Sequence, residues 1–464
     1  MNENYEIVKK LLDTNDTETI RTTVENFQLI EMPDKVVEYV TAKLLLDDNA
    51  VRDIITRILS HNKNKNIANY LVPYISSDVI AARNLAGEIL LSRKSDSVQA
   101  MLNYLPDAND DDQKFIVDIL GLIGDKSATE EIINVLKVSK DDNTILACIE
   151  ALGNLKAPEG VDDIISMYDV NELFQPTIIE ALGKIGTPEC INFINANYYG
   201  VDELTKFPLI ESLGEIGNEE SFNMLINDLQ YLDTAYKWVA IEAIGKLQER
   251  LNLDLPADKV LKTSLIETLE SSDDQYKKSA IKLINLFEGE EIIEYVFGIY
   301  GKDENVDQEL KEYFHKNSIV FFKKIIPYIK TTPENLKPCV EVIKELIQFD
   351  EGESLQQLSE LELRGFVEEF TVLLSNPDEE IRNLAIELLF YLDAETALLF
   401  GDTMLEDPNS WNRLKLLEII QYGDDPRIIE LIKELAKDKD EVVKENAQNI
   451  LNERGLTNLE LKEQ

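Results

Sequence analysis

One segment, Asp107–Asp118, has a spacing that could hold a metal ion. Oxygen-bearing side chains stand at loop positions 1, 3, 5 and 12, the pattern that binds Ca²⁺ in helix–loop–helix sites. The segment lacks the turn glycine at position 6, and it ends in aspartate where such loops carry glutamate. A second interpretation therefore stays open, in which the segment is an inter-helix loop whose aspartates cap the next helix.

Other groups that could do chemistry are few and isolated. His61 and His315 have no partner histidine, cysteine or His-Glu pair nearby in the sequence. Cys148, Cys190 and Cys339 are odd in number and far apart, and the first two lie in apolar runs typical of small core residues. Carboxylates are so abundant that pairs of them arise by chance. We therefore expect no catalytic residues, no metal and no cofactor, and a protein that is not an enzyme.

Composition restricts the partners further. The 464 residues include 89 Asp and Glu against 46 Lys and Arg, a formal net charge of −43. This charge argues against nucleic acid as a partner, because phosphate backbones are held by Lys and Arg. An apolar content of 44% is enough to build a core. Met1–Leu12 resembles no signal peptide and no stretch is long and apolar enough to cross a bilayer, so we expect a cytoplasmic protein.

An internal repeat dominates the chain. Glycines at 153, 183, 214 and 245 each follow an acidic residue and two small or aliphatic residues, and they recur every 30 or 31 positions. In the segment ending at Gly245, apolar residues recur at helical spacing. A short turn such as 185–189 follows, where Thr187 can cap a second helix that has Pro188 in its first turn. Each repeat is thus predicted to be two antiparallel helices of about three turns, which need stacking to bury their apolar faces.

The repeat resembles the HEAT-like family named after the phycobilin lyases. That family has a Val-Arg pair followed by Ala-Leu-Gly-x-Ile-Gly-Asp; Ile381-Arg382 occupies the first place and Ile123-Gly124-Asp125 the end of the second. The resemblance covers about residues 71–455. It implies an all-α, right-handed α-α superhelix, a HEAT-like α-solenoid of about twelve two-helix repeats with a 31-residue period. Ile145 and Gln175 replace the arginine in central repeats, which puts the family's inter-repeat arginine contacts in doubt there.

Departures from the period suggest four segments. We expect degenerate helical cap repeats in 1–70, regular repeats in 71–250, divergent repeats with polar inserts in 251–365, and C-terminal repeats with a cap in 366–464. The inserts fall near 251–259 and 349–363, and the register of the repeats between 286 and 365 stays open. The polar outer face of the last repeat is typical of a capping repeat.

Two rows of repeat positions are candidates for a binding face. An acidic row occupies the place just before Ala-Leu-Gly, and an apolar row lies about four residues earlier. In designed relatives of the family, these positions lie on the concave binding face, so the resemblance implies that both rows line it. The acidic row is Asp118, Glu150, Glu180, Glu211 and Glu242, and the apolar row is Phe115, Leu146, Phe207 and Trp238.

Charge supports a binding role for these rows. Residues 141–236 contain 18 acids and only three lysines, and such a surface steers basic partners toward it. We therefore predict a scaffold or adaptor that binds a basic or amphipathic segment of another cytosolic protein, with no nucleic acid and no membrane insertion. The alternatives are a lyase or protein-modifying enzyme subunit that presents a protein substrate, and a self-assembling structural solenoid. The acidic row could also be a solvated face, and Phe207 and Trp238 could pack on adjacent repeats.

Overall fold

A computed structural model describes residues 31–256, 258–271, 273–331 and 333–456, together with Asp13, Asp16, Glu18 and Thr22. Within these residues the chain forms 27 α-helices and eight short 3₁₀ helices, which confirms the all-α prediction. The expected segments 1–70 and 366–464 lie partly outside the described residues. No helix among those described is long and apolar enough to cross a membrane.

The chain divides into two compact units. Unit 1 comprises Met1–Asp228 and Lys246–Leu253, and unit 2 comprises Leu229–Gly245 and Asp254–Gln464. Helix α16 (Thr234–Leu251) contributes to both.

Unit 1 is a series of short helices in which many pack on the helix two places further along the chain, as α4 does on α6 and α10 on α12, and others pack on the next helix. The α-helices are α3 (Asp34–Ala42), α4 (Asn49–His61), α5 (Ile67–Leu71), α6 (Ile80–Ser92), α7 (Ser95–Tyr104), α8 (Asp110–Ile123), α9 (Thr129–Val138), α10 (Asp142–Asn154), α11 (Val161–Ser166), α12 (Gln175–Ile185), α13 (Pro188–Asn197), α14 (Glu203–Ile216) and α15 (Glu219–Asp228). The 3₁₀ helices are η1 (Lys43–Leu45), η2 (Val72–Ser76), η3 (Leu105–Asp107), η4 (Lys126–Ala128), η5 (Pro158–Gly160) and η6 (Glu172–Phe174).

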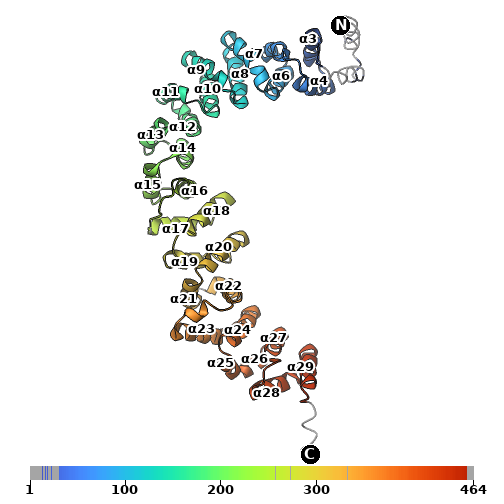
Figure 1. Cartoon of the computed structure of the whole chain (residues 1–464), viewed down its shortest axis with the longest axis vertical. Helices are drawn as coiled ribbons and strands as arrows, with labels where there is room; N and C mark the ends of the chain where they lie inside the picture. The colour runs from blue at the N-terminus through green and yellow to red at the C-terminus, as the bar shows by residue number, and fades with distance from the viewer. Residues whose placement is uncertain are drawn as a thin grey trace, which may run out of the picture. The chain divides into compact units, whose positions relative to one another are not determined.

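The alternation produces two layers within unit 1 (Figure 1). We call α8, α10, α12 and α14 the inner layer, because in Figure 1 they lie on the inside of the bend that unit 1 follows. The outer layer is α9, α11, α13 and α15. Inner helices pack on one another in sequence, α8 on α10, α10 on α12, and α12 on α14, which buries the apolar stripe that no helix could bury alone.

Glycine allows the inner helices to approach closely. A Cβ atom added to Gly153 on α10 would lie 2.8 Å from Ala181 Cα on α12, and one added to Gly121 on α8 would lie 2.8 Å from Ala151 Cα on α10. Both distances are well inside van der Waals contact. The glycine before the inter-helix turn is therefore a packing requirement at these two repeats.

The predicted turn chemistry is present between α12 and α13. Gly186 has φ +74°, the left-handed conformation that ends a helix, and Thr187 Oγ1 accepts a hydrogen bond from the Cys190 backbone N–H. Pro188 is in the first turn of α13. Cys148 and Cys190 are fully buried thiols, which confirms the prediction that they are core residues. Before α8 the cap is Asn109, whose side chain accepts from the Asp112 N–H.

Unit 2 continues the same alternation. Its α-helices after α16 are α17 (Lys259–Thr268), α18 (Asp274–Ile284), α19 (Gly289–Phe297), α20 (Glu304–Lys316), α21 (Ser318–Ile329), α22 (Leu336–Phe349), α23 (Glu360–Leu373), α24 (Glu379–Leu392), α25 (Ala394–Leu399), α26 (Gly401–Leu405), α27 (Ser410–Ile420), α28 (Pro426–Leu435) and α29 (Glu441–Glu453). The 3₁₀ helices are η7 (Pro333–Asn335) and η8 (Leu355–Gln357).

Twelve successive helix pairs, from α4/α5 to α27/α28, account for the predicted number of repeats in the described residues. Between 286 and 365, where the sequence left the repeat register open, the structure has two helix pairs. These are α20/α21, which are separated only by Asn317, and α22/α23. The helix before the first insert is longer than expected, since α16 ends at Leu251, where the insert begins, and has 18 residues instead of about eleven. The second insert is a loop that contains η8.

Cations in the Val-Arg place link each repeat to the next in parts of both units. In unit 2 the Arg382 guanidinium binds both carboxylate oxygens of Asp407, at 2.7 and 3.0 Å, and Arg413 binds Asp438 in the same way, at 2.6 and 2.8 Å. At Ile145, where the arginine is missing, Thr144 Oγ1 donates to the Asp110 carbonyl of the preceding repeat instead.

Candidate protein-binding face

The structure places the predicted site residues on successive inner helices, and seven of the nine belong to unit 1. Phe115 and Asp118 lie on α8, Leu146 and Glu150 on α10, Glu180 on α12, and Phe207 and Glu211 on α14. Trp238 and Glu242 lie on the part of α16 that belongs to unit 2.

Inner helices run parallel and in register, which aligns the acidic row. Gly183 faces Ser212 and Gly186 faces Ile216, pairs that are 29 and 30 residues apart. Packed helices lie roughly 8–10 Å apart, so Glu180 and Glu211 are separated by about that distance across the α12–α14 pair. Glu150, Glu180 and Glu211 are all exposed.

In the part of the chain that the structure describes, two of these carboxylates form no ion pair, although lysines line the same grooves. Among the described residues, no ion pair or hydrogen bond engages the side chain of Glu150 or Glu180. Asp118 differs, because Lys114 Nζ lies 2.6 Å from its carboxylate one turn earlier on α8. Unpaired and exposed carboxylates can accept bonds from a partner without first breaking an internal contact.

A groove of about 750 Å³ runs between α12 and α14. Glu180, Glu211 and Glu215 contribute three carboxylates to its lining, and Lys156, Lys184 and Lys246 contribute three ammonium groups. The groove is therefore less acidic than the sequence predicts for this region.

The lysines of this groove are partly engaged. Lys184 Nζ donates to Asn154 Oδ1 at 2.8 Å, and Lys246 Nζ donates to Glu215 Oε1 at 2.7 Å. These bonds cross from one inner helix to a neighbouring repeat. Two of the three lysines of residues 141–236 are concentrated in this groove. The acidic excess of that region consequently lies mainly on the loops and the outer layer.

A second groove, of about 300 Å³, lies between α8 and α10. Asp118 and Glu150 line it together with Lys114 and Asn154, and the exposed side chain of Leu122 adds an apolar patch. Both grooves thus contain consecutive members of the acidic row.

The apolar row is less uniform than the acidic row. Phe207 is 37% exposed and Leu146 is half-buried, each one turn before a glutamate of the acidic row. Phe115 is one position further along its repeat, and its ring packs over Gly87 and lies 5.1 Å from the Arg83 guanidinium. Phe115 therefore packs on the preceding repeat and offers less surface to a partner than Phe207 does.

Glu242 differs from the other members of the acidic row. Its side chain is only 6% exposed, and Gln275 Nε2 donates a hydrogen bond to its carboxylate. Trp238, one turn earlier, is half-buried, and its indole N–H is buried without a hydrogen-bond partner. The exposed part of the acidic row within unit 1 therefore ends at Glu211.

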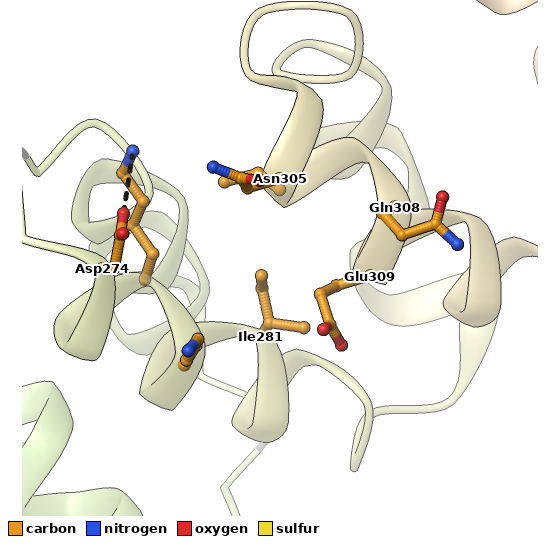
Figure 2. A pocket seen from close by; sticks show the side chains of 8 residues that line it. Asp274, Ile281, Asn305, Gln308 and Glu309 are labelled. Atoms are coloured by element: carbon orange, nitrogen blue, oxygen red, sulfur yellow. Dashed lines mark ion pairs between the residues drawn. The ribbon is translucent and has the colours of Figure 1, made fainter.

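Unit 2 has a separate small cavity between α18 and α20 (Figure 2). Asp274, Ile281, Asn305 and Glu309 surround a space of about 310 Å³. Lys277 in its wall is engaged, with Nζ 2.5 Å from an Asp303 carboxylate oxygen. Its lining mixes charges of both signs.

Sequence reasoning did not identify several residues of the unit 1 face. Lys184 is four residues after its acidic-row glutamate, one helical turn along the same stripe. Leu173 and Leu204 are seven residues before theirs, two turns in the other direction, and both are highly exposed. Extending the stripe by one turn after the acidic row and by two turns before it would have identified all three.

Comparisons with known proteins give information only about the fold of this chain. No model of a known protein family matches the chain, and no curated protein sequence matches it. The phycobilin-lyase type of repeat therefore gains no support. Among solved structures, importin beta in an ammonium sulfate condition matches 97% of this chain and 74% of its own, with 11% identity and a TM-score of 0.49. Kap121p bound to Pho4p and Kap121p bound to Nup53p match with 13% and 14% identity and TM-scores of 0.40 and 0.42, each covering 97% of this chain. The chain spans 60% of the Kap121p chain in both.

Proposed function

We propose that the protein is a non-enzymatic scaffold whose inner layer in unit 1 holds a basic or amphipathic segment of another protein. The observation that carries the proposal is the pair of exposed carboxylates, Glu150 and Glu180, which lie on adjacent inner helices and form no ion pair or hydrogen bond within the described residues. Each lines a groove that crosses the layer.

The charges of the face indicate how such a segment would bind. Basic side chains would pair with Glu150 and Glu180, while the engaged lysines of the α12–α14 groove would contribute hydrogen-bond donors beside them. Alternating signs select a partner by pattern as well as by net charge, because a misplaced lysine would face Lys184. The net charge of −43 would add long-range attraction and speed encounter with a basic partner.

Affinity capture from native lysate tests the proposal. Wild type is compared with Glu150→Lys/Glu180→Lys, which reverses both unpaired carboxylates, at about 0.15 M and about 1 M salt. We expect a protein with a basic segment to bind wild type at low salt. It should be lost at high salt, where the screening length falls from about 8 Å to about 3 Å. It should also be lost from the variant.

A matched control reverses two exposed glutamates on the outer layer. Glu130→Lys/Glu220→Lys changes net charge by the same amount, but the residues lie on α9 and α15. Capture should survive in this control. Equal loss in both variants would show that only total charge matters, and capture unaffected by either variant would refute the inner layer as the binding face.

A further inference from the structure

An apolar ridge lies at one edge of unit 1, where outer helices return to inner helices. We define the ridge as Val170, Leu173, Tyr199 and Leu204. Their exposed fractions lie between 63% and 74%, although they are among the larger apolar residues of the region. Val170 and Leu173 lie in the connection from α11 to α12, and Tyr199 and Leu204 occupy the same part of the next repeat. Two consecutive repeats therefore leave the same places apolar and exposed.

Register brings the members of the ridge together. Because α12 and α14 pair residues about 30 positions apart, extending this register by one turn places Leu173, just before α12, level with Leu204 in the first turn of α14. Their separation is about the interaxial distance of roughly 8–10 Å. Leu204 and Phe207 are on one face of α14, so the ridge continues toward the acidic row at Glu211. The ridge and the acidic row thus form one continuous surface.

Charge around the ridge is negative. Asp169 and Glu172 flank its first half, and Asp202 lies between the two members of its second half; all three are exposed. Hydrogen bonds from Thr205 hold the pKa of Asp202 below its ordinary value, so this carboxylate stays charged at neutral pH. The nearby cation, Lys206, is engaged by other groups.

Lys206 makes its contacts on the side of this edge that faces the protein interior. Its ammonium lies 3.4 Å from Asp228 and 3.6 Å from the centroid of the Tyr198 ring, and burial lowers its pKa. The same Asp228 carboxylate accepts the Tyr198 hydroxyl hydrogen bond at 2.8 Å. Lys206 therefore does little to neutralise Asp169, Glu172 and Asp202 at the surface.

We infer that the ridge is the docking site for the apolar side of a basic amphipathic helix from another protein. This inference rests on the proposed function and adds where and how the partner is anchored. Residues seven apart on one face of a helix are about 10.5 Å apart, which matches the spacing of Leu173 and Leu204. A helix crossing α12 and α14 would place two apolar side chains on the leucines and basic side chains near Asp169, Glu172 and Asp202.

The negative charge of this surface also disfavours other classes of partner. A second copy of this chain would bring its own acidic edge against this one, and its net charge of −43 would oppose approach. An anionic lipid surface or a nucleic acid would meet the same repulsion. A basic helix is the occupant for which both the apolar and the charged parts of the surface are complementary.

A synthetic probe tests the inference directly. The probe is an 18-residue helix of Leu and Lys with one apolar stripe, carrying a photo-reactive group at the centre of that stripe. A second peptide of the same composition has its sequence scrambled so that no stripe forms. We expect the striped probe to bind the full chain more tightly than the scrambled one and to cross-link to residues 168–175 and 197–208.

Substitution of the ridge gives the second readout. Leu173→Ser/Leu204→Ser should weaken binding of the striped probe by on the order of tenfold or more, from the loss of two apolar contacts. The control is Leu361→Ser/Leu399→Ser in unit 2, where both leucines are equally exposed and Leu361 has the same position in its helix as Leu204. This control should bind like wild type.

The two proposals fail in different ways. Cross-links on α10, α12 and α14 near Glu150 and Glu180, with binding unaffected by Leu173→Ser/Leu204→Ser, would overturn the ridge and leave the proposed function standing. Equal binding of the striped and scrambled peptides would also overturn the ridge, because it would show attraction by net charge alone. A concentration-dependent dimer of the free chain that Leu173→Ser/Leu204→Ser dissolves would assign the ridge to a second copy and refute the inference.

Discussion

Two glycines at the same place in the repeat are predicted to respond to alanine in opposite directions. In Gly153→Ala the new methyl group would lie 2.8 Å from Ala181 Cα and 2.9 Å from its Cβ, so α10 and α12 must move apart. In Gly245→Ala the nearest atom would be Leu283 Cδ1 at 3.8 Å, an ordinary contact. Both glycines are helical and both follow an acidic residue and two aliphatic residues.

The magnitudes follow from two opposing effects. Alanine is favoured over glycine inside a helix by about 1 kcal/mol, which applies fully to Gly245 in the interior of α16. Overpacking typically costs about 1–3 kcal/mol, and for Gly153 it acts against a smaller gain, because this residue is near the end of α10. We therefore expect Gly245→Ala to raise the free energy of unfolding by up to about 1 kcal/mol, and Gly153→Ala to lower it by about 1–2 kcal/mol.

Native-state hydrogen exchange is the suitable assay, because a repeat array need not unfold in one step. In Gly153→Ala, amides of α10 and α12 should exchange about tenfold faster for each 1.4 kcal/mol lost, while those of α18 should not change. In Gly245→Ala the amides of α16 and α18 should exchange more slowly. Gly121→Ala should behave like Gly153→Ala, since its methyl group would meet Ala151. Exchange in α10 and α12 that is unchanged or slower in Gly153→Ala would refute the close packing of inner helices.

Three further predictions concern the ion pairs between repeats in unit 2 and one helix cap in unit 1. Arg413→Lys should lower the free energy of unfolding of the C-terminal repeats by about 1–3 kcal/mol in urea titrations, because lysine cannot reproduce the two parallel bonds to Asp438. Acid should weaken the same region. Burial favours the neutral form of Asp407 and Asp438, but the arginine bonds hold the pKa of each carboxyl below its ordinary value of 3.8. Their stabilisation is present above that value and is lost as pH falls through the lowered pKa, so thermal unfolding from pH 6 to 3 should show melting temperature falling at the acidic end. Thr187→Ala should cost α13 about 1 kcal/mol, measured by urea titration, because it removes the bond that caps the Cys190 N–H.

The fold was predictable because the same helix-pair pattern recurs many times along the chain. Helical spacing, the Thr187 cap and the period of the glycines each indicate the same helix pair, and errors in one repeat are corrected by its neighbours. The length of α16 was not predictable, since the polar residues after Gly245 can continue a helix or end it. Sequence alone also gave no register between 286 and 365, where the glycine pattern is absent.

The placement of the candidate residues on successive inner helices was predictable, but their exposure was not. Alignment of the internal repeats identifies Glu242 as the equivalent of Glu211. Glu242 is nevertheless buried against Gln275 from the next repeat, a contact that no local sequence pattern indicates. Counting charge along the chain likewise could not show that Lys184 and Lys246 gather in one groove while the acids occupy the edge. Both depend on which side chains the packing of neighbouring repeats brings together.

We propose that a partner covers the inner layer of unit 1. Hydrogen exchange of the full chain, measured with and without the partner captured by wild type, can locate the covered surface. We expect slower exchange in α10, α12 and α14 on binding, with no change in α9, α11 and α13, and loss of this protection in Glu150→Lys/Glu180→Lys. Protection confined to the outer layer or to unit 2 would refute the proposal.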